Sequence, residues 1–487
     1  MKKIIVTMIA SLILFTGFAT PVYALSDAQS VAMQTLLDDA CRISGVPSMS
    51  ISIIDGDETF YFSSGYADRE KRLPASENTL YELASVSKAF TGVGILLLEE
   101  QGLLSMTDPV QKYLPWLTME YKGIPADMQS LTLNHFLHHT SGLTNRKHVQ
   151  SIPQGSTPDM LRKTVEALVD AELAFPPGEQ YEYGTVNYDV LGLVIEVVSS
   201  QSYESFMTEQ VFRPLGLYHT YVYKEEAQAT GQLAQGYRSS FFITSPYDAP
   251  DYAGNKPAGY IMSCTKDMAH WMDIQMGDVQ DIPEVFKAVI MKSHHGDVSV
   301  PNVNGMYYAG GWMVNADKTI IEHSGSNPNF STKVVILPNE RTAFCLLTNG
   351  ANTNISLVKS IKDILDGNLT QSYKISGIQL LDIILSSATI IVCLLAIIFF
   401  ILGLRRKKIN ERKSITKKRI LITVVWLMVT VAICIMCWVF PMFFGYDWST
   451  LLVWQTYSIL TVLISLALLT ASITFFVYTR QHNAVSR

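Results

Sequence analysis

The sequence predicts an α/β (α+β) fold in which one sheet is built from both ends of a large domain, with a helical insert between them. Strand-like segments occur near residue 50 and again after residue 310, and the segments between them have helical apolar spacing. Three long apolar runs follow after residue 380, and they predict three transmembrane helices behind this domain.

The first 24 residues have the pattern of a secretory signal peptide. Lys2 and Lys3 form a basic start, residues 4–18 are apolar, and Val22-Tyr23-Ala24 has the small residues of a cleavage site. An uncleaved membrane anchor is the alternative. In either case we expect residues 25–374 to lie outside the cytoplasm.

Apolar spacing and turn residues predict the elements of residues 25–374 in order. The N-terminal part is expected to form a helix and then two strands joined by Asp55-Gly56-Asp57, a sequence typical of a hairpin turn. The middle is expected to be helical, and its first long apolar helix ends before Gly102. The expected helices are 26–44, 89–100, 131–136, 158–174 and 188–199, and the expected strands are 49–54, 59–64, 310–314, 319–323, 331–337 and 342–348.

The membrane domain is predicted over residues 375–487. Its apolar runs, at about 383–404, 420–440 and 451–479, are each long enough to cross a bilayer. The connection 405–419 carries nine basic residues and one acidic residue, and such loops stay cytoplasmic. The chain is therefore predicted to be a multi-pass protein of a bacterial cell membrane, with residues 25–374 on the extracytoplasmic side.

Charge and cysteine content exclude several classes of function. Residues 25–374 hold 24 Lys and Arg against 40 Asp and Glu, which argues against nucleic acid as a partner. Three cysteines lie in this domain, so at most one disulfide is expected there. No Cys/His spacing is typical of zinc, and the histidines at 135, 138 and 139 lack an accompanying glutamate. We expect no metal and no cofactor.

Ser85-Val86-Ser87-Lys88 places a hydroxyl and an amine one helical turn apart, on the same helix face. A neutral amine at this position can activate the hydroxyl as a nucleophile, and burial of the apolar helix that follows would lower the pKa of Lys88. The spacing is weak evidence alone, because three other pairs share it: Ser263 with Lys266, Ser356 with Lys359, and Ser414 with Lys417. Ser414 lies in the basic loop, and the other two pairs lack partners after them in the required order.

Two later segments could complete a site around Ser85. Tyr183 precedes the 188–199 helix, and a phenol near a cationic amine can serve as a general base. A packing role is the alternative. His323-Ser324-Gly325-Ser326 ends a predicted strand, whose edge could supply one N–H group to an oxyanion while the Ser85 N–H supplies another. An ordinary strand end is the alternative. No Gly-x-Ser-x-Gly string is present, so the α/β-hydrolase nucleophile elbow is excluded.

The order of these motifs resembles the serine β-lactamase-like family, in its branch of class C β-lactamases, D-aminopeptidases and esterases. The resemblance rests on TLYELASVSKAFTG (79–92), LTLNHFLHHTSGL (131–143), and residues 175–192 and 322–330. It implies an antiparallel sheet flanked by helices, with an all-helical subdomain and the site between them. It also implies Ser85 as the acylated nucleophile, Lys88 as its partner, Tyr183 as the general base, and the N–H groups of Ser85 and Ser326 as oxyanion donors. The substrate-binding positions that it implies are Thr185, His323, Ser324, Gly325, Asn327 and Asn329.

Two positions depart from the family pattern. Thr185 stands where asparagine usually follows the tyrosine, and His323 stands where lysine usually opens the last motif. Both departures count against an efficient β-lactamase. The signal peptide, the domain and three spans together resemble membrane-bound peptidases that remove an N-acyl-D-asparagine cap from prodrug precursors. In that group Asn327 and Asn329 would read the amide; the alternative is that they only shape the turn around Pro328.

The sequence thus predicts a membrane-anchored serine hydrolase that cleaves amide bonds of D-amino-acid-containing peptides or prodrug precursors through an acyl-enzyme. Its partners would be a small peptide or prodrug substrate and the lipid bilayer. An esterase or cell-wall-modifying enzyme, acting on D-alanyl esters or peptidoglycan stems, is the alternative. A β-lactamase or penicillin sensor is a further one.

Overall fold

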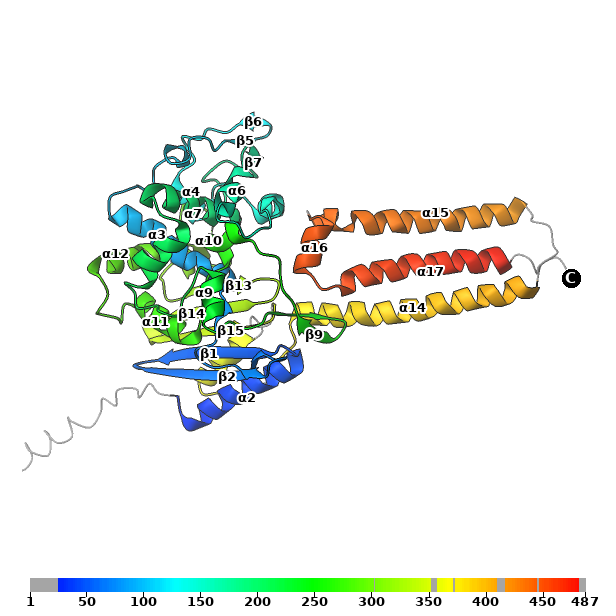
Figure 1. Cartoon of the computed structure of the whole chain (residues 1–487), viewed down its shortest axis with the longest axis horizontal. Helices are drawn as coiled ribbons and strands as arrows, with labels where there is room; N and C mark the ends of the chain where they lie inside the picture. The colour runs from blue at the N-terminus through cyan, green and yellow to red at the C-terminus, as the bar shows by residue number, and fades with distance from the viewer. Residues whose placement is uncertain are drawn as a thin grey trace, which may run out of the picture.

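The computed structural model of the chain describes residues 25–301, 303–351, 357–370, 373–409, 417–444 and 446–480. The predicted signal peptide lies outside the described residues, as does the middle of the basic loop. Figure 1 shows a large domain from which the long C-terminal helices extend together on one side.

An eight-stranded antiparallel sheet forms the centre of the domain, in the order β11-β12-β13-β14-β15-β1-β2-β3. Its two halves come from opposite ends of the domain and meet where Met49 of β1 pairs with Thr348 of β15. The predicted sheet built from both ends is therefore confirmed. The strands are β1 (Ser48–Asp55), β2 (Glu58–Asp68), β3 (Leu73–Pro74), β11 (Met306–Tyr308), β12 (Met313–Asn315), β13 (Ile321–Ser326), β14 (Ser331–Leu337) and β15 (Thr342–Thr348).

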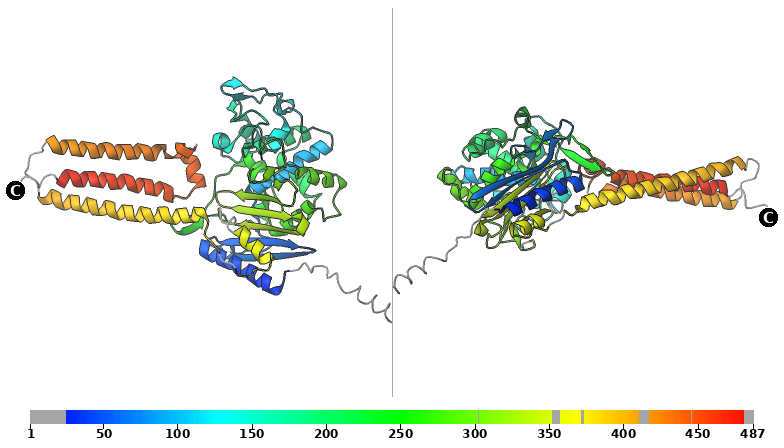
Figure 2. Two further views of the ribbon diagram at one scale, coloured as in Figure 1. Left: turned by 180° about the vertical axis from the view of Figure 1, so that it is seen from behind. Right: turned by 90° about the horizontal axis from the view of Figure 1, so that it is seen from below.

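Helices cover both faces of this sheet. On one face α2 (Asp27–Ser44) and α13 (Val358–Leu365) bury an apolar layer against β1, β14 and β15. A reciprocal capping box between Ser26 and Gln29 begins α2, and Gly45 ends it in the left-handed region at φ 71°. The larger core on the other face joins the sheet to α3 (Ser87–Glu100), α11 (Thr265–Met276) and α12 (Glu284–Ser293). Figures 1 and 2 show these layers.

The insert between the two halves of the sheet is mainly helical, and it lies beyond α3. Its helices are α4 (Leu133–Leu137), α5 (Asn145–His148), α6 (Met160–Glu166), α7 (Val186–Ser199), α8 (Tyr203–Phe206), α9 (Lys224–Ala229) and α10 (Lys256–Gly259), with a π-helical turn over Met207–Phe212. Short strand pairs also occur in this part of the chain: β4 (Tyr81–Glu82) with β10 (Met262–Ser263), and β8 (Tyr237–Ser240) with β9 (Ile243–Pro246).

The predicted all-helical insert and its 158–174 helix are corrected by the structure. A three-stranded sheet of β5 (Met119–Tyr121), β6 (Ile124–Pro125) and β7 (Ala171–Glu172) interrupts the insert. The helix stops because Asp170 adopts φ 58° and donates its N–H to the Thr118 carbonyl. The chain then pairs in parallel with β5. Pairing with β5, which lies about 50 residues earlier in the chain, thus limits the helix, and local apolar spacing cannot predict such pairing.

Among the residues that the structure describes, three helices are long and apolar enough to cross a membrane. They belong to α14 (Gly377–Ile409), α15 (Lys417–Val439) and α17 (Ser458–Arg480), and the candidate spans are Gly377–Arg405, Ile420–Phe443 and Ser458–Thr479. The third span begins at Ser458 instead of residue 451, because residues 448–454 form a separate short helix, α16 (Trp448–Trp454). In Figure 1, α16 lies between these long apolar helices and the domain.

Candidate active site

A strained turn presents Ser85 at the start of α3. Residues Ala84–Val86 form one 3₁₀ turn, in which Ala84 takes φ 47°, a conformation that costs free energy in a residue other than glycine. Two hydrogen bonds to Ile261 hold the turn. The Leu83 N–H donates to the Ile261 carbonyl at 2.8 Å, and the Ile261 N–H donates to Ser87 Oγ at 3.0 Å. The position of the serine is therefore set by contacts on both sides of it.

Lys88 is completely buried behind Ser85. Its Nζ donates to the Ala258 carbonyl at 2.7 Å and to Thr185 Oγ1 at 3.1 Å, and it lies 3.4 Å from Ser85 Oγ. Burial lowers the pKa of the Lys88 amine to about 7. A neutral amine has two N–H groups and one lone pair. Since the carbonyl and Thr185 take the two N–H groups, the lone pair is left for the Ser85 hydroxyl proton.

A buried carboxyl group acts on Lys88 from α7. The carboxyl of Asp189 accepts a hydrogen bond from Asn255 Nδ2 at 2.6 Å, and its Oδ1 has no partner among the described residues. Burial raises the pKa of Asp189, while the hydrogen bond from Asn255 and the charge of Lys88 oppose that rise. In return, the negative charge of Asp189 raises the pKa of Lys88 and partly offsets the desolvation. No motif in the sequence marks Asp189 as part of the site.

Replacing Asp189 by asparagine is expected to move the acidic limb of the kcat/KM pH profile to lower pH. Removing the carboxylate leaves desolvation of Lys88 unopposed, so that its pKa falls further and the neutral amine persists at lower pH. The measurement is the pH dependence of kcat/KM. Glu196→Gln is the matched control, because it neutralises another carboxyl of α7 whose pKa burial also raises, and which Tyr203 N–H binds. An unmoved limb in D189N, or the same movement in E196Q, would contradict the coupling.

Tyr183 lies next to this pair in the loop before α7. Lys88 Nζ is 5.0 Å from the centre of the Tyr183 ring, and the ring packs 4.3 Å from that of His139. Burial raises the pKa of the phenol well above 10, although the Ser85 hydroxyl opposes the rise. Tyr183 is therefore a neutral phenol at pH 7, and its hydroxyl is a proton donor beside Ser85.

Asn145, which belongs to none of the motifs seen in the sequence, positions the Tyr183 loop. Its N–H donates to the Tyr183 carbonyl at 2.9 Å, and its Oδ1 accepts the Thr185 N–H at 2.7 Å. It follows Thr140-Ser141-Gly142 closely in the sequence, but nothing in its own neighbourhood marks it as a contact of the tyrosine motif. Thr185, although shorter than the usual asparagine, still reaches the amine of Lys88.

The last motif runs along β13, which packs directly on the turn that carries Ser85. A Cβ at Gly325 would lie 2.4 Å from the Leu83 carbonyl oxygen and 3.0 Å from Ser85 N, so only glycine allows this approach. Ser326 follows at the end of the strand and lines the same cavities as Ser85. The two backbone segments expected to supply oxyanion donors therefore lie together.

Replacing Gly325 by alanine is expected to lower kcat/KM by about 10²-fold or more, because β13 must move away from the Ser85 turn and a displaced oxyanion donor costs that much. Overpacking should also lower the free energy of unfolding by about 1–3 kcal/mol. Activity assays and thermal unfolding measure the two effects. Gly377→Ala is the control, since a Cβ there meets nothing within 4 Å. Full activity in G325A would show that the close approach is not needed.

His323 opens this motif as a neutral side chain. Its Nδ1 donates to the Ser324 carbonyl at 2.8 Å, and its Nε2 accepts from Tyr308 Oη at 3.1 Å. Burial, together with the charges of Lys88 and Lys333, lowers the pKa of His323 to about 3. The cation on this side is Lys333 of β14, which pairs with Glu322 at 2.9 Å. A lysine within the apolar strand 331–337 was the signal that could have identified it.

Two cavities meet at Ser85, Tyr183 and Ser326. One, of about 320 Å³, extends along β13 past His323, Ser324 and Lys333. The other, of about 210 Å³, extends between α10, α5 and α16, and Asn327 lines it. The Asn327 amide donates to Glu82 Oε2 at 2.6 Å and to the Gly259 carbonyl at 3.0 Å, so both of its N–H groups are occupied.

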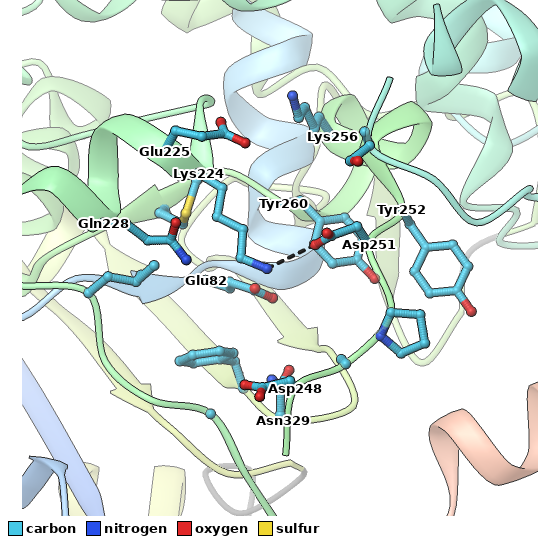
Figure 3. Close-up of a pocket in the computed structure, with 18 of the residues that line it drawn as sticks. Glu82, Lys224, Glu225, Gln228, Asp248, Asp251, Tyr252, Lys256, Tyr260 and Asn329 are labelled. Atoms are coloured by element: carbon cyan, nitrogen blue, oxygen red, sulfur yellow. Dashed lines mark hydrogen bonds and ion pairs between the residues drawn. The ribbon is translucent and has the colours of Figure 1, made fainter. Parts of the chain in front are cut away.

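Asn329 is not brought to either of these cavities. Its amide donates to the Tyr247 carbonyl at 2.9 Å, and it lines a separate pocket of about 420 Å³. Figure 3 shows this pocket, which is lined by charged side chains such as Glu82, Lys224 and Asp251. A proline turn separates the two asparagines, so that neighbouring positions in the sequence face different cavities.

The remaining candidates from the sequence are the other Ser-x-x-Lys serines and the histidines near residue 138. Ser263 is buried and its hydroxyl lies 2.9 Å from that of Thr220, whereas Ser356 and Ser414 lie outside the described residues. His138 binds the Tyr308 carbonyl and His139 accepts from Asn187 Nδ2. Among the residues described, no group of three or more His, Cys, Asp or Glu could hold a metal ion.

Comparison with known proteins identifies the family. Residues 33–366, more than half of the chain, match the beta-lactamase family. The chain belongs to the beta-lactamase family. Protein flp of Staphylococcus aureus (strain MW2) is 29% identical over 466 residues, which cover 91% of this chain and 88% of the relative. A match of that extent includes apolar helices as well as the domain.

Two further similarities agree with membership of the beta-lactamase family. Penicillin-binding protein 4* of Bacillus subtilis (strain 168) is 28% identical over 319 residues, 60% of this chain and 66% of the relative. The octameric penicillin-binding protein homologue from Pyrococcus abyssi has the same fold, with a TM-score of 0.62 at 24% identity over 71% of this chain and 79% of that one. The family and fold predicted from the motifs are thus confirmed, and this family consists generally of serine hydrolases.

Proposed function

We propose that this protein is a membrane-anchored extracytoplasmic serine peptidase that cleaves amide bonds of D-amino-acid-containing peptides or prodrug precursors through an acyl-enzyme. One observation carries the proposal. The buried Lys88 amine, whose pKa burial lowers to about 7, lies 3.4 Å from Ser85 Oγ, and the neutral Tyr183 phenol lies beside both.

The proposed reaction begins with attack of Ser85 Oγ on the substrate carbonyl while Lys88 takes the hydroxyl proton. The resemblance implied Tyr183 as the general base, but burial keeps its phenol neutral at pH 7, so we assign that role to Lys88. The N–H groups of Ser85 and Ser326 stabilise the oxyanion. Collapse of the tetrahedral intermediate breaks the C–N bond, and the leaving nitrogen receives a proton from the Tyr183 phenol. The proton that Lys88 took from Ser85 then passes to the Tyr183 phenolate. Water hydrolyses the ester by the reverse route: Lys88 takes a proton from the water, and Ser85 Oγ regains one.

Three features support a peptide over a β-lactam as the substrate. Thr185 replaces an asparagine amide that could hold a substrate amide, and the neutral His323 offers no charge to a carboxylate. Lys333 is already paired with Glu322. An efficient carboxylate-binding site would need that ion pair to open first.

Location outside the cytoplasm rests on topology. The three apolar helices, the basic residues of 405–419 and the signal-like N-terminus support one orientation, with the domain outside and the basic loop inside. Anchoring would keep the enzyme at the boundary between the cell membrane and water, on the extracytoplasmic side.

Mass spectrometry of the purified full chain, in detergent, tests the proposal. Incubation with a fluorophosphonate probe is expected to add one phosphonyl group, the probe mass less HF, to the peptide that contains Ser85. N-acyl-D-asparaginyl peptides should then be cleaved at least tenfold faster than their L-isomers. Labelling at another residue, or turnover without any covalent intermediate, would overturn the assignment.

The similarity to penicillin-binding protein 4* supports a second candidate, a wall-modifying enzyme or esterase. It would favour D-Ala-D-Ala peptides or short D-alanyl esters over N-acyl-D-Asn peptides in the same assay. A stable benzylpenicilloyl adduct without peptide turnover would instead indicate a penicillin sensor.

A further inference from the structure

The membrane domain contributes one side of the Ser85 cavity. Helix α16 joins the ends of the second and third candidate spans, and the figures show it next to the domain at that end of the helix bundle. Leu451 and Trp454 of α16, with Tyr446 just before it, line the cavity that also contains Ser85 and Tyr183. Residues more than 350 positions apart in the chain therefore share one pocket.

Arg238 of β8 holds α16 in this position. Its Nη1 donates to the carbonyl groups of Leu452 at 2.7 Å and Val453 at 3.0 Å, near the C-terminal end of the helix, where carbonyls lack partners within it. The guanidinium carbon lies 3.7 Å from the ring centre of Tyr247 and 4.0 Å from that of Tyr457. The side chain is buried between the two parts of the protein.

A second buried contact joins the same parts. Asp382 of α14 accepts the N–H groups of Phe241 and Phe242, at the tip of the β8–β9 hairpin, and the hydroxyl of Thr456 at 2.5 Å. The tip also exposes Phe242 and Ile243, which are 55% and 66% accessible. Exposed apolar residues beside the start of a candidate span are expected of a surface that meets the bilayer.

We propose that α16 completes the Ser85 pocket as a subsite for an apolar substituent of the substrate, next to the bond that is cleaved. Leu451, Trp454 and Tyr446 lie on the membrane side of the cavity, and Val149 and Ile152 of the insert line it as well. Apolar side chains from both parts thus border a polar floor of Ser85, Tyr183 and Thr185. Such a cavity gains binding free energy from an apolar group that would otherwise remain in water.

The position of the subsite selects a class of substrate. Because α16 connects two apolar spans, the cavity opens at the level where those spans leave the bilayer. A molecule that is polar at its scissile amide and apolar beside it would lie at that same boundary. The substrates are therefore amphiphiles. This inference rests on the proposed hydrolase function, and it assigns part of the specificity to the membrane domain.

Two series of substrates test the subsite with the full chain in lipid nanodiscs. One series varies the acyl side of the scissile amide from acetyl to octanoyl, and the other varies the amine side over the same lengths. In one of the two series, Leu451→Ala and Trp454→Ala are expected to reduce the ratio of kcat/KM for the longest substituent to that for the shortest by about tenfold.

The same helix offers matched controls. Leu452→Ala and Trp448→Ala remove identical side chains that do not line the cavity, and they should keep the parent ratio. Thr450→Trp places a larger side chain in the cavity and so reduces its volume, and it should depress turnover of long substituents alone. The subsite would be overturned if L451A, W454A and T450W kept the parent ratio of kcat/KM values in both series. It would also be overturned if L452A and W448A lowered that ratio as much as the cavity variants do. If Ser85 of the parent is labelled while these ratios do not change, only the subsite fails and the hydrolase assignment stands.

Discussion

Replacing Ser85 by alanine is expected to abolish covalent labelling by acylating probes and to reduce kcat by on the order of 10⁶-fold, as loss of a serine nucleophile does in other hydrolases. The reason is local. The Ala84 turn and the contacts to Ile261 present this hydroxyl to the Lys88 amine, and a methyl group cannot form the ester. Probe incorporation and peptide turnover should both be measured, and the thermal unfolding midpoint should change little.

Ser263→Ala is the matched control for this prediction. Ser263 has the same spacing to a lysine and is also buried, but its hydroxyl is paired with that of Thr220, and neither Ser85 cavity reaches it. S263A should therefore keep full labelling. Labelling that persists in S85A would place the nucleophile elsewhere.

Replacing Lys88 by methionine is expected to lower kcat/KM by about 10³-fold, the size of a general-base contribution. In the wild type, activity should rise with pH through about 7, because the neutral amine that accepts the Ser85 proton predominates only above the lowered pKa. K88M should lack this acidic limb. A pH profile of kcat/KM for both proteins measures the effect.

Stability provides an independent readout of the same amine. An unfolded lysine titrates near 10.4, whereas burial lowers the pKa of folded Lys88 to about 7. Between these values the unfolded chain binds the proton and the folded chain does not, so this residue makes stability rise with pH from about 7 to about 10. The difference in unfolding free energy between wild type and K88M should follow that slope.

Lys333→Met is the control for the pH profile of kcat/KM, and K333M should keep the acidic limb of that profile. A limb that survives in K88M would assign the base to another group.

Apolar periodicity predicted the strand bounds best for two strands inside the sheet, which have a paired strand on each side. Residues 331–337 and 342–348 form β14 and β15 with the predicted bounds. The helix 158–174 ends early and the third span starts late, because Asp170 bonds to Thr118 in one case and α16 packs on the domain in the other. Such contacts join residues far apart in the chain, which a local pattern cannot report.

Some residues of the site could likewise be predicted from the sequence, and others were found only in the structure. Motif order identified Ser85, Lys88, Tyr183 and Ser326, and the structure brings all four together. It adds Asn145, Asp189 and Lys333, whose surroundings in the sequence are ordinary. Each acts through a neighbour from another element, as Asp189 does through the charge of Lys88.

The sequence alone determined the family and the apolar helices, and it predicted Ser85 as the nucleophile, because motif order, length and apolar periodicity can be read without coordinates. Tertiary structure alone decided the protonation states and the shape of the pocket. Desolvation depends on every atom packed around Lys88 and His323, and α16 reaches Ser85 only through the folding of both parts of the chain against each other.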